Sequence, residues 1–469
     1  MTRAENWELI LRVCEQSEDD TFAAIRVPLL NDFCKAPFQP DSHCRHLLVA
    51  GKTLLFAGQI RPRSPLAAQR NHPLILVPHA SGSNLLNLLP VAREAKNRGW
   101  AGLVVAGDGV DPEPLAEFES VVTERELWSL ARRQGMGRIF RTAQQKFKKL
   151  VGLLEPINAD YARRVRRNYG WFLRQLVVAV AMRDSFETLL ADWQPSCVVS
   201  TSDYWPFEYQ LFCAAKRMGI PTAIIQHGEL TNVTCWPTYA DTFLAWGAVF
   251  EQALLTKGAP ASRVRVCGMP AADKLFNRVV MENLKTVNTA APVCLVFSHT
   301  NDRLEDPLTF ANYTRFLREA IARLTRVQWQ IRLHPAEDDS FYRELGLIGH
   351  PRVQLQTREV SLDESVAAAD VVCTIRSTAG LQAMMLGRPL IVLDLTPEEP
   401  CSVWWPPFGG GLAVKDAEAF IATFDHLIDE PHFREKQLAA QREFLDQAFA
   451  HKGRAAAAIV DYLAEAALS

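Results

Sequence analysis

Short apolar runs and longer amphipathic stretches alternate along most of the chain, and this alternation predicts its elements. A short run without polar alternation is typical of a strand buried on both faces, whereas apolar residues spaced three and four apart indicate a helix. In the first half, strands are predicted at Leu74–Val77, Gly102–Ala106, Cys197–Ser200, Thr222–Gln226, Thr242–Ala245 and Arg263–Cys267. Helices are predicted at Leu85–Arg98, Phe207–Met218 and Ala248–Lys257, and residues 124–192 are predicted to be mostly helical.

The same alternation resumes after a polar stretch, Glu282–Ala291. It predicts strands at Val293–Phe297, Trp329–Leu333, Val353–Gln356, Val371–Thr374 and Pro389–Leu393, and helices at Pro307–Leu324, Asp339–Leu345, Leu362–Ala369 and Gly380–Leu386. Strands separated by helices pair in parallel through right-handed crossovers. Two consecutive series of this kind predict an α/β protein with two doubly wound, Rossmann-like parallel sheets.

The pattern divides the 469 residues into five segments, which fits a chain too long for one ordinary domain. Residues 1–70 form an N-terminal extension of unknown role. A first domain spans 71–281 and contains the helical insert 124–192, and a linker at 282–291 leads to a second domain, 292–430. Helices in 431–469 are predicted to pack back across both domains.

Composition and charge bear on the partners. A hydrophobic content of 48% and a charged content of 22% are typical of a globular protein, and a net charge of −2 gives no reason to expect nucleic acid. Between Arg132 and Arg174, however, twelve Lys and Arg stand against two acids. This excess predicts contact of residues 132–174 with an anionic membrane surface, or with an acidic or lipid-phosphate-linked acceptor, although a solvated helical hairpin has the same composition.

Targeting and redox signals point to the cytoplasm. The N-terminus is amphipathic and acidic rather than a signal peptide, and the apolar run Leu176–Met182 is far shorter than a membrane span. Ten cysteines are scattered without CxxC pairs, so neither a disulfide framework nor a zinc site is expected. We expect a cytoplasmic protein. If the basic insert binds lipid, the protein would lie at the inner face of the inner membrane.

Polar residues gather after the predicted strands of the second half, where open parallel sheets bind ligands. Arg332 and His334 lie on one side at the end of Trp329–Leu333, and Pro335 stops that strand. An Arg and a His together suit a phosphate, although a structural His at a strand end fits the same pattern. The other predicted donor-binding residues follow two neighbouring strands: Ser298, His299, Thr300, Ser377, Thr378 and Gly380. Hydroxyls and backbone N–H groups at a helix start favour anions, but Ser and Thr are also ordinary caps.

The first half offers acid–base groups after three strands. His79 and Ser81 follow the first strand and are predicted on the acceptor side, while Asp203, His227 and Glu229 follow two later strands. Such a group can deprotonate a hydroxyl while the second half neutralises a phosphate. We favour Asp203 as the base, because a Ser-Thr-Ser-Asp loop at a strand end is expected to be exposed. No Asp-x-Asp sequence occurs to hold a metal, so we expect neither a metal nor a cofactor.

Five segments of the chain resemble bacterial GT-B glycosyltransferases of capsule and lipopolysaccharide synthesis. They are GIPTAIIQHGE at 219–229, FLAWG at 243–247, VCGMPAADKL at 266–275, QIRLHPAED at 330–338 and RSTAGLQAMMLGRPLIVLD at 376–394. The His-Pro and Ser/Thr elements are similar to those of CMP-sugar users, the sialyl and Kdo transferases, and of CDP-glycerol glycerophosphotransferases. The resemblance, which covers Pro195–Leu393, implies a GT-B fold with two domains facing a cleft, the acceptor in 71–281 and the donor in 292–430.

The resemblance also implies roles. His334, Ser377 and Thr378 would hold the donor phosphate, and the base would be Asp203, His227 or Glu229. The E-x7-E pattern that retaining enzymes carry in this part of the fold is absent from residues 376–394, which favours inversion. We therefore expect an inverting, metal-independent transferase that moves a sugar from a nucleotide-sugar donor, CMP-linked in our first choice, to a bacterial surface glycan.

Three alternatives remain open. A polyol-phosphate transferase of the CDP-glycerol type would use a similar donor site. Non-hydrolysing UDP-GlcNAc 2-epimerases resemble the chain too, but the two glutamates of their SGGLQEEA loop are replaced by Ala383 and Met384. A non-catalytic GT-B subunit is the third alternative.

Overall fold

A computed structural model gives the arrangement of most of the chain. It describes residues 3–17, 20–26, 29, 74–79, 82–107, 113–116, 118, 120–133, 135–203, 206–228, 230, 236–278, 287–298, 307–334, 337–357, 359–375, 377–395 and 405–468. The chain divides into two units. The first contains Met1–His227, Val233–Ala271 and Arg454–Ser469, and the second contains Gly228–Asn232 and Ala272–Gly453.

The first unit is built on a parallel sheet with the strand order β3-β2-β1-β4-β5-β6-β7. Its strands are β1 Leu74–His79, β2 Ala101–Ala106, β3 Ser120–Thr123, β4 Cys197–Ser200, β5 Thr222–Ile225, β6 Thr242–Ala245 and β7 Val264–Val266. Every side chain of β4, β5 and β6 is buried, as expected for central strands covered on both faces. The strand β3, half-buried along its length, was not predicted from the sequence.

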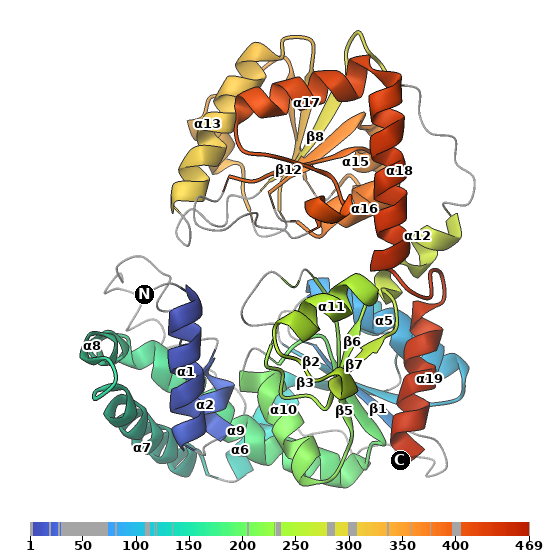
Figure 1. The fold of residues 1–469 in the computed structure, drawn as a ribbon. Helices are drawn as coiled ribbons and strands as arrows, with labels where there is room; N and C mark the ends of the chain where they lie inside the picture. Colours follow the sequence, from blue (N-terminus) through green and yellow to red (C-terminus); the bar gives the residue numbers. More distant parts are fainter. Residues whose placement is uncertain are drawn as a thin grey trace. The chain divides into compact units, whose positions relative to one another are not determined.

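Helices cover both faces of this sheet (Figure 1). On one face α5 (Gly82–Asn97) packs on β1 and β2, and the C-terminal α19 (Ala455–Leu468) packs beside it on β4. On the other face lie α10 (Pro206–Arg217) and α11 (Ala248–Thr256). The remaining helices are α1 Arg3–Ser17, α2 Asp20–Ala24, α6 Glu124–Arg133, α7 Met136–Leu154, α8 Ala159–Arg167 and α9 Tyr169–Trp193.

The helical part of the first unit is centred on α9. Its buried side chains extend all around the helix, because α6, α7 and α10 pack against it. The short α2 also contacts α9 and α10, so the N-terminal residues are part of this unit. The start of α8 is fixed by Asn158, whose side chain accepts a hydrogen bond from the N–H of Tyr161.

The second unit repeats the topology with the strand order β10-β9-β8-β11-β12-β13, again all parallel. Its strands are β8 Val293–Phe297, β9 Gln328–Arg332, β10 Val353–Gln356, β11 Val371–Thr374, β12 Leu390–Leu393 and β13 Leu412–Val414. Its helices are α12 Asp273–Arg278, α13 Pro307–Arg323, α14 Ser340–Glu344, α15 Leu362–Ala368, α16 Ala379–Met385, α17 Ala417–Asp429 and α18 Pro431–Ala448.

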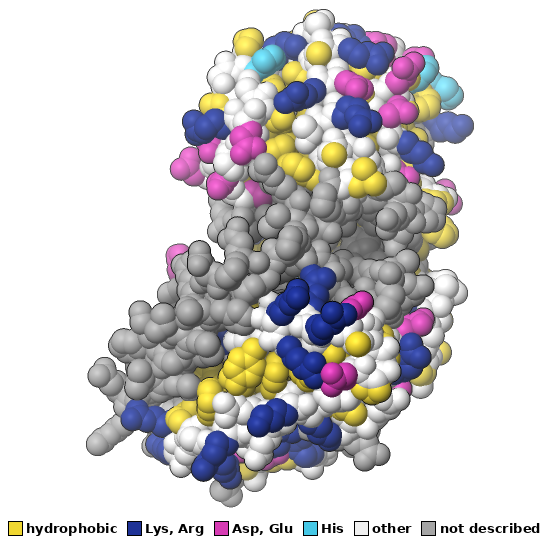
Figure 2. Space-filling view, turned by 90° about the vertical axis from the view of Figure 1, so that its left-hand side faces the viewer, with side chains coloured by type: hydrophobic (Ala, Val, Ile, Leu, Met, Phe, Trp, Pro, Cys, Tyr) yellow, Lys and Arg dark blue, Asp and Glu magenta, His cyan; other side chains and the backbone are white. Residues whose placement is uncertain are grey.

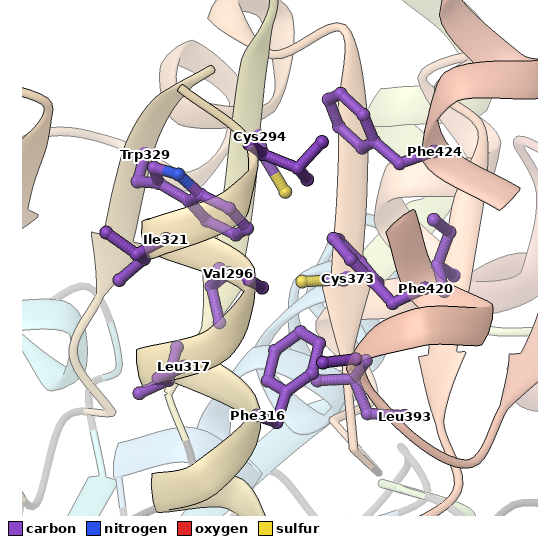
Figure 3. Packing of buried hydrophobic residues seen from close by; sticks show 14 of the residues in the cluster. Cys294, Val296, Phe316, Leu317, Ile321, Trp329, Cys373, Leu393, Phe420 and Phe424 are labelled. Carbon is purple, nitrogen blue, oxygen red and sulfur yellow. The ribbon is translucent and has the colours of Figure 1, made fainter. Parts of the chain in front are cut away.

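The main core of the second unit lies between the sheet and the helices α13 and α17. Alternate residues of β8 and β9, such as Cys294, Val296 and Trp329, point into it (Figure 3), as the two-residue period of a strand requires. Phe316 from α13 meets Phe420 from α17 edge to face, with ring centroids 4.9 Å apart. This core holds β8, β9 and β11 in register, and their ends carry the candidate site.

Candidate functional site

Each sheet has a point where the strand order reverses, and ligands of open parallel sheets bind beyond the strand ends at such a point. The reversal lies between β1 and β4 in the first unit and between β8 and β11 in the second. The connections after these strands and their neighbours β5 and β9 carry the site residues predicted from the sequence.

In the second unit, His334 lies exposed just beyond β9, in a connection that Glu337 holds in shape. The backbone N–H of His334 donates to Oε2 of Glu337 at 3.1 Å, and the N–H of Glu337 donates to the carbonyl of His334 at 2.9 Å. The exposed position of His334 allows it to meet a ligand at this edge. Glu337 was not predicted from the sequence, although an acid three residues after His334 was a usable signal.

The sequence predicts Ser298 on the surface of this edge, but in the structure Ser298 lies beneath it. Its side chain is 3% exposed. Its Oγ donates to Oε2 of Glu337 and accepts a hydrogen bond of 2.6 Å from the hydroxyl of Tyr342, which lies 3.3 Å from that of Tyr313. The Ser298 hydroxyl links Glu337 to the buried tyrosines, and a direct contact of Ser298 with a donor stays a prediction.

Arg332 also differs from its predicted role in a joint phosphate clamp with His334. Its Nη1 donates to the carbonyl of Val360 at 2.8 Å and to Oγ of Ser365 at 2.9 Å. These contacts fix the connection between β10 and α15. The helix α15 begins with a capping box formed by Ser361 and Glu364. Arg332 therefore holds this connection through Nη1, and partial burial lowers its pKa. Its predicted contact with a phosphate stays a prediction.

After β11, Ser377 and Thr378 precede α16 as expected. Oγ of Ser377 accepts a hydrogen bond of 3.2 Å from the N–H of Ala379, so this hydroxyl acts as a local cap. Gly380 is closely packed, and its predicted contact with a donor stays a prediction. A Cβ there would lie 3.1 Å from Cγ2 of Thr374 and 3.2 Å from Leu390, closer than the helix and sheet allow. Thr378 remains the half-buried hydroxyl at this edge, with no side-chain capping bond.

In the first unit, the expectation that Asp203 is exposed is wrong. Its side chain is 1% exposed, and Nη2 of Arg26 lies 2.9 Å from its Oδ1. Its Oδ2 accepts hydrogen bonds from Oγ1 of Thr238 at 3.1 Å and from the N–H of Tyr239 at 2.5 Å. The N-terminal segment around α2 covers the loop after β4, which the local sequence of that loop could not indicate. A substrate hydroxyl cannot reach this carboxylate in the observed conformation.

His227, two residues beyond β5, is half-buried at the same edge. Its Nδ1 lies 2.6 Å from the carbonyl oxygen of Thr201, in the loop after β4. Because a carbonyl only accepts, Nδ1 carries the proton and the neutral ring has its lone pair on Nε2. Burial lowers the pKa of His227 below the usual 6.5, and the bond to Thr201 offsets this only in part. The ring is therefore neutral near pH 7 and suited to accept a proton.

Several predicted site residues lie outside the described residues. They are Glu229, Pro335, His299, Thr300 and Ser81, and the side chain of His79 is likewise not described. Their roles stay predictions. In the described part of the chain, no group of three or more His, Cys, Asp or Glu side chains is arranged to hold a metal ion. The reaction's independence of a metal stays a prediction.

The basic stretch forms the outer faces of α7 and α8. In α7, Ile139, Ala143, Phe147 and Leu150 point inward, while Arg138, Arg141, Lys148 and Lys149 are exposed on the opposite side. In α8, Arg163, Arg166 and Arg167 are exposed. Figure 2, which faces this side of the protein, shows Lys and Arg side chains spread over the first unit. None of the described helices is long and apolar enough to span a membrane.

Comparison with known proteins finds the fold but no sequence family. No family model and no curated protein matches the chain. Among solved structures, it resembles a UDP-GlcNAc 2-epimerase of Neisseria meningitidis bound to UDP-GlcNAc, with 16% identity, 84% of this chain and 100% of that chain covered, and a TM-score of 0.53. An Anabaena protein in complex with UDP and glucose shows 13% identity over 84% and 100% of the chains at a TM-score of 0.52.

A glycosyltransferase of Rickettsia africae gives a similar result, with 12% identity, 84% and 99% coverage and a TM-score of 0.52. At such low sequence identity, a structural match shows a shared fold but not a shared reaction. The matches agree with the two parallel sheets and their corresponding strand orders. The chain therefore has the GT-B fold predicted from its sequence, built from two Rossmann-like α/β units.

Proposed function

We propose that this chain is an enzyme acting on a nucleotide-linked sugar, and that it transfers the sugar to an acceptor hydroxyl with His227 as the general base. The observation that carries the proposal is the hydrogen bond between Nδ1 of His227 and the Thr201 carbonyl, which leaves the lone pair of the neutral ring on Nε2. His227 lies beyond the carboxyl end of β5, on the ligand-binding edge of the first sheet.

In this reaction Nε2 of His227 takes the proton of the acceptor hydroxyl. The acceptor oxygen attacks the anomeric carbon, the bond from that carbon to the phosphate oxygen breaks, and the nucleotide leaves with the electron pair. Charge therefore builds up on the departing phosphate. His334, exposed after β9, and the hydroxyl of Thr378 before α16 are suited to bind that charge by hydrogen bonds. We propose the donor in the second unit and inversion by this single displacement, without a metal or cofactor.

The donor nucleotide and acceptor are finer parts of the proposal. The resemblance in the His-Pro and Ser/Thr elements favours a CMP-linked sugar such as Kdo or sialic acid. Two structural neighbours hold UDP or UDP-GlcNAc instead, which makes UDP-sugars equally necessary to test. The resemblance to capsule and lipopolysaccharide enzymes favours a bacterial surface glycan as the acceptor, free or linked to lipid.

Epimerisation of UDP-GlcNAc is the second candidate, because epimerases stand among the structural neighbours. Ala383 and Met384 replace the two glutamates of the epimerase loop and are buried in α16, at 0% and 2% exposure. The carboxylates that such a reaction would use are therefore missing from this helix. An epimerase needs no acceptor, and this property separates the two reactions experimentally.

The test begins with thermal unfolding in the presence of CMP, CDP, UDP and GDP, since a ligand of the folded state raises the melting temperature. The purified protein is then incubated with UDP-GlcNAc, CMP-Kdo, CMP-sialic acid or CDP-glycerol, with and without a bacterial glycan acceptor. Transfer that depends on acceptor supports the proposal. UDP-ManNAc formed without acceptor supports the epimerase, and turnover of CDP-glycerol supports polyol-phosphate transfer.

Variants assign the roles. His227→Ala is expected to lower kcat by about 10²–10⁴-fold, the usual contribution of a general base, while nucleotide binding persists. His334→Ala is expected to abolish the nucleotide-induced rise in melting temperature. His432→Ala, at an exposed position of α18, is the control. If His227→Ala turns over as fast as the wild type, the base assignment is wrong.

The basic faces of α7 and α8 support a proposal about the membrane or acceptor. We propose that they bind an anionic surface, either the inner membrane face or an acidic, lipid-phosphate-linked acceptor. Arg141 and Lys148 lie two turns apart on the exposed side of α7. At about 1 kcal/mol per basic residue near an anionic membrane, losing both weakens vesicle binding by roughly 30-fold.

Vesicle sedimentation with and without phosphatidylglycerol measures this effect on the variant with both residues changed to Glu. Arg318 and Lys436, exposed in the second unit, changed to Glu give a control with the same change in net charge. Loss of vesicle binding in the first variant alone supports a membrane. Loss of activity on an acidic acceptor without loss of vesicle binding supports the acceptor, and no change in either contradicts the proposal.

A further inference from the structure

The N-terminal segment contributes a buried arginine to the edge of the first sheet. Arg26 follows α2 and is 4% exposed. Its Nη1 donates to the carbonyl of Ala23 at 3.0 Å, its guanidinium lies 4.6 Å from the centre of the Tyr209 ring, and its Nη2 pairs with Asp203. A guanidinium so enclosed has one fixed position.

Asp203 connects three parts of the first unit. Its carboxylate joins Arg26 to Thr238 and to the N–H of Tyr239, in the segment before β6. Asp203 itself belongs to the loop after β4. One buried carboxylate therefore fixes the positions of the N-terminal segment, the β4–α10 loop and the chain that enters β6. Without the arginine, this carboxylate would be buried without a counter-charge, and the loop would have to rearrange to solvate it.

The same loop sets the tautomer of His227. The carbonyl that receives the proton of Nδ1 belongs to Thr201, two residues before Asp203. The N–H of Ser202, between them, approaches Oγ of Ser200 at 3.4 Å, so the described backbone turn is short and tightly connected. A shift of the Asp203 carboxylate therefore moves the peptide that holds the His227 ring.

We propose that Arg26 is a positioning residue for His227: its buried ion pair with Asp203 holds the Thr201 carbonyl where it keeps the proton of His227 on Nδ1. The N-terminal segment is thereby part of the machinery for proton transfer, although it touches no reacting atom. The link from Arg26 to the reaction rests on the proposed function of His227, but the link from Arg26 to the tautomer does not.

The tautomer is measured directly by NMR of the full-length protein labelled with ¹⁵N in its histidine rings. The signals of His227 are assigned as those lost in His227→Gln. The wild type is expected to show the Nδ1–H form, and Arg26→Met is expected to lose its dominance. In turnover, Arg26→Met lowers kcat by about 10²-fold with little change in KM, as expected for a misplaced base. Arg12→Ala, exposed on α1, is the control and leaves both unchanged.

If Arg26→Met fails to fold, two milder variants of Thr238 test the same link. Thr238→Val removes a hydroxyl that binds Asp203, while Thr238→Ser keeps it. Thr238→Val is expected to shift the His227 tautomer and Thr238→Ser to retain it. An unchanged tautomer in folded Arg26→Met or in Thr238→Val overturns the proposal. Full turnover in His227→Gln, with the tautomer of the wild type still dependent on Arg26, overturns the base assignment and leaves the structural link intact.

Discussion

Glu208 is a buried carboxylate whose removal should stabilise the protein. It lies in the first turn of α10 and is 1% exposed, and neither carboxylate oxygen has a hydrogen-bond partner among the described residues. Burial raises the pKa of Glu208 from 4.5 to about 8; the backbone N–H of Glu208 itself opposes this rise in part, and the negative charges of Glu124 and Asp203 add to it. The folded protein therefore retains a proton on Glu208 at pH 7 that the unfolded chain has released.

The magnitude follows from linkage. Where the folded state binds the extra proton, stability falls as pH rises, by about 1.4 kcal/mol per pH unit. This loss begins near the unfolded pKa of 4.5 and ends near the folded value of about 8. At pH 7 the accumulated cost is about 3 kcal/mol, a substantial part of the stability of an ordinary domain. Glu208→Gln removes the ionisation at nearly constant volume.

We expect Glu208→Gln to match the wild type near pH 4.5 and to exceed its free energy of unfolding by up to about 3 kcal/mol at pH 7. Urea unfolding is measured between pH 5 and 8 by hydrogen exchange of peptides from α10, because two units can unfold separately. Glu435→Gln, at an exposed position of α18, controls for the loss of one negative charge. A difference between Glu208→Gln and the wild type that does not grow with pH would refute the reasoning.

Three further predictions concern the second unit and are checked by urea unfolding. Gln441→Leu should cost about 2–4 kcal/mol, because the buried amide of Gln441 accepts from the N–H of Leu390 and donates to a nearby carbonyl, and both backbone groups would lose a partner. Phe420→Ala should cost about 3–5 kcal/mol, since its ring is fully buried. Gly411→Ala should cost at least about 1 kcal/mol, because φ is +108° and a Cβ would lie 3.0 Å from a backbone oxygen, whereas Gly102→Ala, with open space around it, serves as the control.

The sheets were predictable to the extent that their strands are buried. Runs such as Cys197–Ser200 and Leu390–Leu393 have no polar residue facing water, so composition alone reveals them. The edge strands β3 and β13 escaped prediction; every residue of β3 is half-buried, and β13 has only one buried residue. Their apolar signal does not exceed that of an ordinary loop.

The sequence selects the strand ends that carry the candidate site residues, but it does not predict the contacts of those residues. The rule that ligands bind after parallel strands selected the connections that carry His227 and His334, because those connections follow buried runs. The partners of each polar residue come from distant parts of the chain. Arg26 reaches Asp203 from the N-terminal segment, and Glu337 reaches Ser298 from the connection after a neighbouring strand. A single sequence contains no local signal for such pairs.

Burial is the main difference between Asp203 and His227 as candidates for the proposed general base. Both residues follow central strands of the first sheet, and both types of side chain can accept a proton. Asp203 is 1% exposed, pairs with Arg26 through Oδ1 and accepts hydrogen bonds from Thr238 and Tyr239 at Oδ2, so it connects three segments. Nδ1 of His227 lies 2.6 Å from the carbonyl oxygen of Thr201, and the side chain is only half-buried. We therefore propose that Asp203 fixes the loop and that His227, held by this loop, is the base, although Asp203 is the residue that the sequence favoured.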